Sequence, residues 1–269
     1  MNAPDHFPGK NVDTERMPGH WLLSRIGKRV LRPGGSQMTQ RMLEALNIQG
    51  DDDVIEFAPG LGITAKAVLA RKPRSYTGVE RDEKAAHIVR NYLFGSQQLC
   101  LVGSAEQTGL PTGQASVVYG EAMLTMQGPR QKAAIIQEAA RLLRTSGRYG
   151  IHELCLVPET LPPDARDKIE RDLSATIHIG ARPLTIPEWR QLLKDHGFEI
   201  ALSTVAPMRL LEVNQLITDE GLGRALLIAK RLLSGGRARA RVLAMRAVFR
   251  KHRDNLRAVA IVGVKKRFQ

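Results

Sequence analysis

Cysteine is nearly absent from this chain of 269 residues, which contains only Cys100 and Cys155. Both lie in short apolar segments typical of buried strands, and they form neither a disulfide framework nor a metal-binding cluster. We therefore expect two inert thiols in the core. Aromatic residues make up only 4% of the chain, including two tryptophans, and this scarcity argues against recognition of RNA by base stacking.

Long apolar runs are missing as well. No stretch of about 18 apolar residues occurs, so we expect no transmembrane helix. The first ten residues are polar and include Pro4 and Pro8, without the apolar centre of a signal peptide, so we expect a cytoplasmic protein. A length of 269 residues with 43% hydrophobic residues fits one sizeable α/β domain with insertions.

Negative charge is scarce in the last part of the chain. Residues 224–269 contain 14 Lys and Arg against one acid, Asp254, a surplus equal to the whole net charge of +13. In this part Val242, Met245 and Phe249 recur at helical spacing and predict one apolar stripe. Two interpretations stay open. Either the arginines only face water, or they attract an anionic substrate, anionic lipid headgroups or a nucleic acid.

The chain does contain a strand, a glycine turn, a helix and a second strand that ends in an acid. Residues 54–57 predict a buried strand, which leads through Gly60 and Gly62 into a helix over 63–70. The second strand, 75–79, ends at Glu80. This is the layout of a mononucleotide-binding half-fold. Glycines without Cβ allow a ligand close to the backbone, and the acid at the strand tip can accept two hydrogen bonds from a ribose.

An acid inside the turn motif narrows the type of nucleotide. Glu56 would repel a pyrophosphate and attract a cationic amino-acid group. The motif therefore resembles motif I of the class I S-adenosylmethionine (SAM) methyltransferases, acid-x-G-x-G-x-G, with Ala58 in place of the first glycine. Later segments agree in order and spacing. They are three strands at 98–102, 115–119 and 148–153, a helix from 135 that stops at Gly147, and a helix at 187–196 followed by a strand.

The resemblance covers roughly residues 40–205 and a last strand, and it is greatest to the branch that methylates small molecules and quinone precursors. It implies an α/β fold, a Rossmann-like, doubly wound and mainly parallel seven-stranded sheet. An antiparallel last strand would lie between the fifth and sixth strands, with a helical cap and insertions. We expect an N-terminal leader and cap helix in 1–36, with that helix running from His20 to Arg32. We further expect a SAM-binding core in 37–153, an inserted lid or pocket wall in 154–185, and a C-terminal part in 186–269 with a basic helical insertion at 213–253.

The resemblance also implies which residues bind the cofactor. Ser104 and Ala105 would bracket the adenine, and S-adenosylhomocysteine (SAH) would be the product. No metal is expected. The candidate cofactor-binding residues are Glu56, Ala58, Pro59, Gly60, Gly62, Glu80, Arg81, Ser104, Ala105 and Glu121.

Four side chains at the ends of the fourth and fifth strands are candidates for catalysis: Tyr119, Glu121, His152 and Glu153. The usual pKa of a histidine suits a general base, although His152 is also compatible with a hydrogen-bonded structural histidine. Glu121 would contact the cofactor or the methyl acceptor, or it would cap residues 122–124. His20, Trp21 and His178 are weaker candidates for the pocket.

These features predict a SAM-dependent methyltransferase acting on an O, S, N or C atom of a small molecule, with a quinone-like or lipid-like acceptor favoured. The basic helices would contact an anionic membrane or substrate. The sequence Asn/Asp-Pro-Pro-Tyr, typical of enzymes that methylate amino groups of nucleic acids, is absent after the fourth strand. One alternative is an RNA or protein methyltransferase that docks through the basic helices, and another is a non-catalytic SAM-binding subunit.

Overall fold

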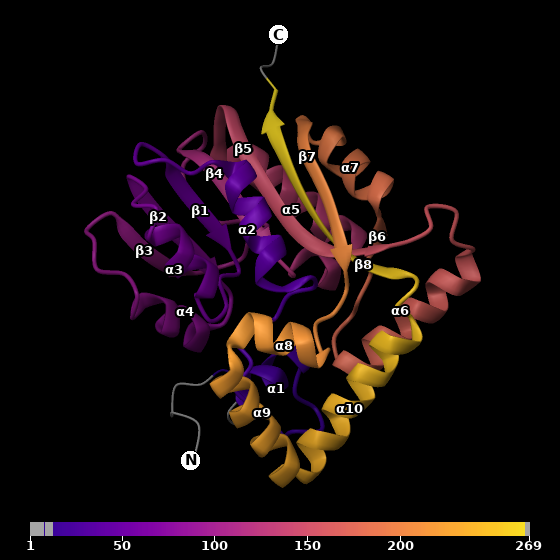
Figure 1. Cartoon of the computed structure of the whole chain (residues 1–269). Helices are drawn as coiled ribbons and strands as arrows, with labels where there is room; N and C mark the ends of the chain where they lie inside the picture. Colours follow the sequence, from indigo (N-terminus) through magenta and orange to yellow (C-terminus); the bar gives the residue numbers. More distant parts are fainter. Residues whose placement is uncertain (1–7, 9–12, 267–269) are drawn as a thin grey trace.

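The computed structural model describes Pro8 and residues 13–266, and a twisted eight-stranded sheet forms its centre (Figure 1). The strand order is β3-β2-β1-β4-β5-β8-β7, with the short β6 paired to β5. The strands are β1 (Asp53–Phe57), β2 (Ser75–Glu80), β3 (Gln98–Val102), β4 (Ala115–Glu121), β5 (Leu143–Leu156), β6 (Leu184–Thr185), β7 (Phe198–Pro207) and β8 (Leu256–Lys265).

The direction of the strands confirms the predicted topology. Strands β1 to β5 are parallel, and β8 enters antiparallel between β5 and β7. Parallel strands need helical crossovers, which cover both faces of the sheet. Six consecutive residues of β4, Ala115 to Gly120, are accordingly buried. The two-residue β6 is the one addition to the seven strands that the sequence predicts.

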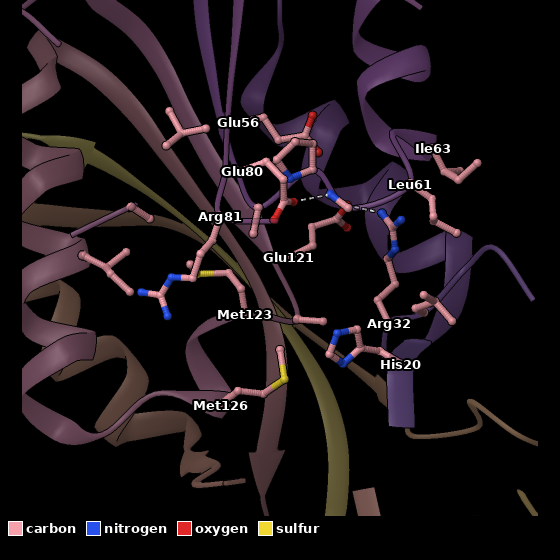
Figure 2. A pocket seen from close by; sticks show the side chains of 18 of the residues that line it. His20, Arg32, Glu56, Leu61, Ile63, Glu80, Arg81, Glu121, Met123 and Met126 are labelled. Atoms are coloured by element: carbon pink, nitrogen blue, oxygen red, sulfur yellow. Dashed lines mark hydrogen bonds and ion pairs between the residues drawn. The ribbon is translucent and has the colours of Figure 1, made fainter. Parts of the chain in front are cut away.

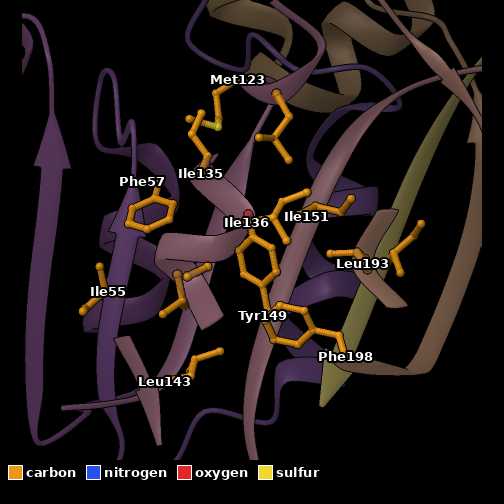
Figure 3. Close-up of a cluster of buried hydrophobic side chains, with 14 of the residues drawn as sticks. Ile55, Phe57, Met123, Ile135, Ile136, Leu143, Tyr149, Ile151, Leu193 and Phe198 are labelled. Atoms are coloured by element: carbon orange, nitrogen blue, oxygen red, sulfur yellow. The ribbon is translucent and has the colours of Figure 1, made fainter. Parts of the chain in front are cut away.

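Helices pack on both faces of this sheet. Buried residues of α2, α3 and α4 belong to one core cluster, and those of α5 and α7 belong to the other. These helices are α2 (Gly35–Leu46), α3 (Ile63–Leu69), α4 (Glu83–Arg90), α5 (Pro129–Leu142) and α7 (Ile186–Asp195). In the second cluster the rings of Tyr149 and Phe198 lie 5.3 Å apart, beside Ile136 and Leu193 (Figure 3).

A third group of helices lies below the sheet in Figure 1 and forms a cap. Its core contains Leu22, Leu173, Ile228 and Met245, each from a different helix. The cap helices are α1 (Gly19–Arg25), α6 (Pro163–Ile177), α8 (Val213–Glu220), α9 (Leu222–Ser234) and α10 (Gly236–Lys251). The predicted pair of basic helices is thereby confirmed as α9 and α10. None of the helices within the described residues has the length and apolar character needed to cross a membrane.

Two predicted helices end earlier than expected. The helix predicted from His20 to Arg32 ends at Arg25, because Gly27 adopts φ +110°, which leaves the helical region. The helix before Gly147 ends at Leu142, and Leu143 already pairs with Ala115 as part of β5. The start of the predicted leader, residues 1–7 and 9–12, lies outside the described residues. Both cysteines are free and buried, as expected.

Candidate functional site

A cavity of about 230 Å³ opens where the parallel strands end, and we call it the strand-end cavity. Nine of the ten predicted cofactor-binding residues line it, from the ends of β1, β2 and β4 and from the turn after β3. Gly62 is the exception. These nine are Glu56, Ala58, Pro59, Gly60, Glu80, Arg81, Ser104, Ala105 and Glu121.

The glycine turn exposes its backbone to this cavity. Gly60 has φ +57°, and a Cβ placed there would meet no atom closer than 4.0 Å, so its missing side chain leaves free space. Gly62 serves packing instead, since a Cβ there would lie 2.9 Å from the ring of Tyr92. Ala58 also adopts a left-handed conformation, φ +52°, where the resembled motif has glycine. The turn thus keeps its shape despite the alanine.

Glu80 holds the glycine turn in place. Its carboxylate accepts hydrogen bonds from the backbone N–H of Gly60 at 2.9 Å and of Asp82 at 3.0 Å. Burial raises the pKa of Glu80, and the N–H donors oppose that rise. A buried carboxylate at the tip of β2 can accept hydrogen bonds from two neighbouring hydroxyls. At the rim, Arg81 lies 3.3 Å from the hydroxyl of Ser104 and 3.4 Å from Glu106.

Glu56 is the most buried acid of the glycine turn. It accepts a hydrogen bond of 2.5 Å from the hydroxyl of Tyr76, and burial raises its pKa to about 7. Tyr119 is fully buried and does not line the cavity; burial, followed by the charge of Glu56, raises its pKa. A carboxyl group poised near neutrality at the cavity wall ionises readily when a cation approaches.

Glu121 is the centre of a hydrogen-bond network beneath the strand-end cavity. It pairs with Arg32, accepts hydrogen bonds from Thr39 at 2.6 Å and from Thr64, and lies 2.8 Å from Nδ1 of His152. Burial alone would raise the pKa of Glu121, but the guanidinium of Arg32 and the contacts with His152 and Thr39 lower it to about 2. Glu121 is therefore an anion throughout the physiological range.

His152 lies in this network and outside the cavity lining. Its side chain is fully buried, with Nε2 2.5 Å from the carbonyl oxygen of Pro33 and Nδ1 against Glu121. Two acceptors face the two ring nitrogens, so neither nitrogen is available to a bound molecule. The geometry suits a residue that orients Glu121 and anchors the segment before α2.

Arg32 is a cavity residue that the sequence analysis missed. It comes from the segment between α1 and α2, crosses to Glu121 and lines the strand-end cavity (Figure 2). Its position depends on a contact 89 residues away in the sequence, so no local pattern marks it. In the sequence, the acid Glu121 at the end of the predicted fourth strand was the one indication of a basic partner, because a buried carboxylate needs one.

A second cavity, of about 100 Å³, adjoins the first, and we call it the apolar cavity. Its wall comes mainly from α1, α6, α10, the segment after α6 and the end of β7. Glu153, its one acid, has both oxygens occupied by backbone and hydroxyl donors from residues 123–125. The apolar lining side chains are Leu23, Leu31, Leu154, Leu173, Ile177, Ile179, Met208, Leu210, Met245 and Phe249.

Four residues line both cavities: His20, Leu31, Ala122 and Met126. His20 lies on the Met126 side of the strand-end cavity in Figure 2. Burial lowers the pKa of His20 to about 4, against a smaller opposing effect of Asp82, so the imidazole is neutral near pH 7. The described residues contain no cluster of His, Cys, Asp or Glu able to hold a metal ion.

Comparison with known sequences gives one match over most of the chain. An uncharacterised protein of Haemophilus influenzae is 31% identical over 211 residues, which covers 76% of this chain and 81% of that protein. The two proteins belong to one family. The model of the ribosomal RNA adenine dimethylase family matches residues 35–104. The ribosomal RNA small subunit methyltransferase A of Marinobacter nauticus is 32% identical over 76 residues, or 28% of this chain and 26% of that enzyme.

Solved structures show the same fold at low sequence identity. The phosphoethanolamine N-methyltransferase 2 of Haemonchus contortus, in complex with phosphomonomethylethanolamine and SAH, superposes with a TM-score of 0.71 at 13% identity. The match covers 97% of this chain and 60% of that enzyme.

Proposed function

We propose that this chain, which belongs to the class I SAM-dependent methyltransferases, methylates an apolar small molecule held in the apolar cavity. One observation carries the proposal. An apolar cavity adjoins the cofactor cavity and shares four lining residues with it, so a molecule seated there lies next to the methyl donor. Ligand pockets of this kind are mostly apolar, with a few polar groups that fix orientation.

The residues of the strand-end cavity fit SAM. We assign the ribose hydroxyls to Glu80, the adenine to Ser104 and Ala105, and the amino-acid end to Glu56 and Arg32. The free space above Gly60 supports this assignment, as do the near-neutral carboxyl of Glu56 and the guanidinium of Arg32, which both line the strand-end cavity. When bound, SAM supplies a methyl group that is already activated by its attachment to a sulfonium. The protein must then orient the acceptor and exclude water.

His20 is the proposed base where the acceptor loses a proton. It borders both cavities and is neutral, so it can accept a hydrogen bond from an acceptor hydroxyl or thiol. It takes up that proton as the methyl group bonds to the oxygen or sulfur and SAH leaves, because the proton on the alkylated atom is strongly acidic. We assign His152 a positioning role, because both its ring nitrogens are occupied, and Glu121 the role of anchoring Arg32. Tyr119 supports Glu56 from behind the cavity. The predicted insertion 154–185 acts as a pocket wall, through Leu173, Ile177 and Ile179.

The match to ribosomal RNA adenine dimethylases concerns the donor half of the chain. It ends at residue 104, before β4 and before α6 and α10, which line the apolar cavity. The matched residues therefore include none of the residues that line the apolar cavity, so the match does not bear on the acceptor.

A turnover assay with a blocked cavity tests the proposal. Purified protein would be incubated with SAM and a panel of phenols, quinols and thiols, and SAH formation would be measured. Ile179→Trp should lower turnover at least tenfold and leave SAM affinity unchanged, because the half-buried Ile179 lines only the apolar cavity. Leu99→Trp, at an exposed position of β3, is the matched control. Equal turnover in both variants, or turnover confined to RNA, would contradict the proposal.

A further inference from the structure

The outer side of the cap contains an apolar groove that shares Leu23 with the apolar cavity and no lining residue with the strand-end cavity. It lies between α8, α9 and α10, has a volume of about 260 Å³, and we call it the outer groove. Five of its lining side chains are large, apolar and substantially exposed: Val213, Ile217, Leu222, Leu226 and Leu243. Contiguous exposed apolar side chains mark interaction sites, whereas single ones need no explanation.

Helix α9 continues this apolar surface along its length. At 100° per residue, Leu222, Leu226 and Leu233 lie within about 40° of one another on the helix circumference, and they are 62%, 62% and 73% exposed. The buried residues of α9, Ala225 and Ile228, lie about 80° and about 140° around the helix from the centre of this stripe. The helix thus has one apolar side for the cap core and a second apolar stripe that faces outward.

Positive charge surrounds the outward stripe. Residues 222–251 contain nine Lys and Arg and no Asp or Glu. Some of these cations pair with acids elsewhere, such as Arg250 with Glu212 and Lys251 with Asp172. Lys230 and Arg239 are exposed, and the described residues provide no acidic partner for either. Leucines flanked by unpaired cations are typical of helices that lie in the surface of an anionic membrane.

We propose that the outer groove and the outward stripe of α9 dock this protein on anionic lipid bilayers. A second copy of the chain fits less well, since a two-fold contact would bring two acid-free basic surfaces together. RNA also fits less well, because leucines occupy the middle of the surface and the described residues place no aromatic ring there for base stacking. Of these three partners, only an anionic bilayer offers an apolar interior for the leucines and negative headgroups for the cations.

The position of α10 connects this surface to the apolar cavity. Met245 and Phe249 line the apolar cavity, while Val242, Leu243 and Arg246 of the same helix line the outer groove. Figure 1 shows α9 and α10 meeting at the end of the molecule far from the sheet. Docking through this end would hold the apolar cavity beside the lipid, where an apolar acceptor is concentrated. The role of the apolar cavity as an acceptor site beside the lipid rests on the proposed function, whereas the docking of the protein on the bilayer does not.

Vesicle sedimentation of the full chain tests the docking, without SAM or an acceptor. Vesicles of phosphatidylcholine alone are compared with vesicles that contain phosphatidylglycerol. The wild type should bind the anionic vesicles and be released by salt. Lys230→Glu with Arg239→Glu should weaken binding about tenfold or more, since each cation near such a surface contributes roughly 1 kcal/mol. Leu226→Gln with Leu233→Gln should also weaken it about tenfold, at positions too exposed to affect folding.

A matched pair on another helix controls for net charge. Arg190→Glu with Lys194→Glu makes the same change on exposed positions of α7 and should leave binding within about twofold. Equal loss in both charge pairs would overturn the proposal, as would equal binding to both kinds of vesicle. A dimer that the leucine variant converts to a monomer, without vesicle binding by the wild type, would assign the surface to a second copy. Binding of a single-stranded RNA oligomer but not of vesicles would assign it to nucleic acid.

Discussion

The strand-end cavity and the apolar cavity adjoin each other but are built from different kinds of sequence. The glycine turn, Glu80 and the turn after β3 lie within 50 residues of one another, each directly after a strand. The wall of the apolar cavity extends from Gly19 to Phe249 and comes from helices of the cap. Parallel strands align their ends in space, so strand order brings these turns together, and His20 and Arg32 complete the strand-end cavity from α1 and the segment after it. The second exists only after distant helices have packed.

The largest expected effect concerns the strand-end cavity alone. Gly60→Trp would fill the free space above the turn and should abolish SAM binding. Glu80→Ala should weaken it by at least about a hundredfold, since two hydrogen bonds to a charged acceptor contribute about 1.5–3 kcal/mol each. Calorimetric titration with SAM and SAH measures both. Glu106→Ala, an acid at the rim that does not line the cavity, should bind normally. Unchanged SAM affinity in a folded Glu80→Ala protein would refute the assignment.

His20 borders both cavities, so a variant without this imidazole distinguishes an effect on methyl transfer from an effect on SAM binding. We expect His20→Asn to lower kcat about a hundredfold, the lower end of what a general base contributes, with SAM affinity within threefold of wild type. His178→Asn, at an exposed histidine that lines neither cavity, is the control. If both variants have the kcat of the wild type, His20 does not accept a proton from the acceptor.

The pH dependence of SAM binding should reflect Glu56. Because burial raises its pKa to about 7, the carboxyl is mostly protonated at pH 6, and binding a cationic amino group requires loss of that proton. SAM affinity should therefore rise by up to about tenfold per pH unit from pH 6 to 7. It should fall again above about pH 8, where the amino group of the ligand loses its charge. Glu56→Gln should remove the change in SAM affinity between pH 6 and 7. If SAM affinity still rises with pH in this variant, another group is responsible.

The smallest effect concerns backbone strain in the glycine turn. Ala58 has φ +52°, a conformation that costs a residue with Cβ about 1–2 kcal/mol. Ala58→Gly should stabilise the protein by about 0.5–1 kcal/mol in urea denaturation, after the larger entropy of an unfolded glycine is subtracted. Ala67→Gly, at an exposed position inside α3, should instead destabilise it by about the same amount. Destabilisation by Ala58→Gly would show that the turn is relaxed with alanine.

The contrast between the cavities also explains what the sequence predicted. The antiparallel last strand followed from the resemblance to the methyltransferase fold. Nine residues that line the strand-end cavity followed from motifs placed at the ends of successive strands. Arg32 could not be predicted because its partner Glu121 is distant in the sequence. Likewise, nothing in the sequence around His152 indicates that the carbonyl oxygen of Pro33 contacts its second ring nitrogen. The early end of α1 depends on Gly27, which a helical pattern tolerates in sequence but which adopts φ +110° here. The wall of the apolar cavity forms by packing of separate helices, so its residues share no periodic pattern in the sequence.

The central place of β8 determines the order in which a newly made chain can fold. This strand pairs with β5 over nine residue pairs and with β7 over nine more, yet the ribosome delivers it after every other described strand. Until then the long edge of β5 is open, and open strand edges recruit other chains. The sheet can therefore close only after β8 has emerged from the ribosome, behind the basic helices α9 and α10 that precede it in the chain.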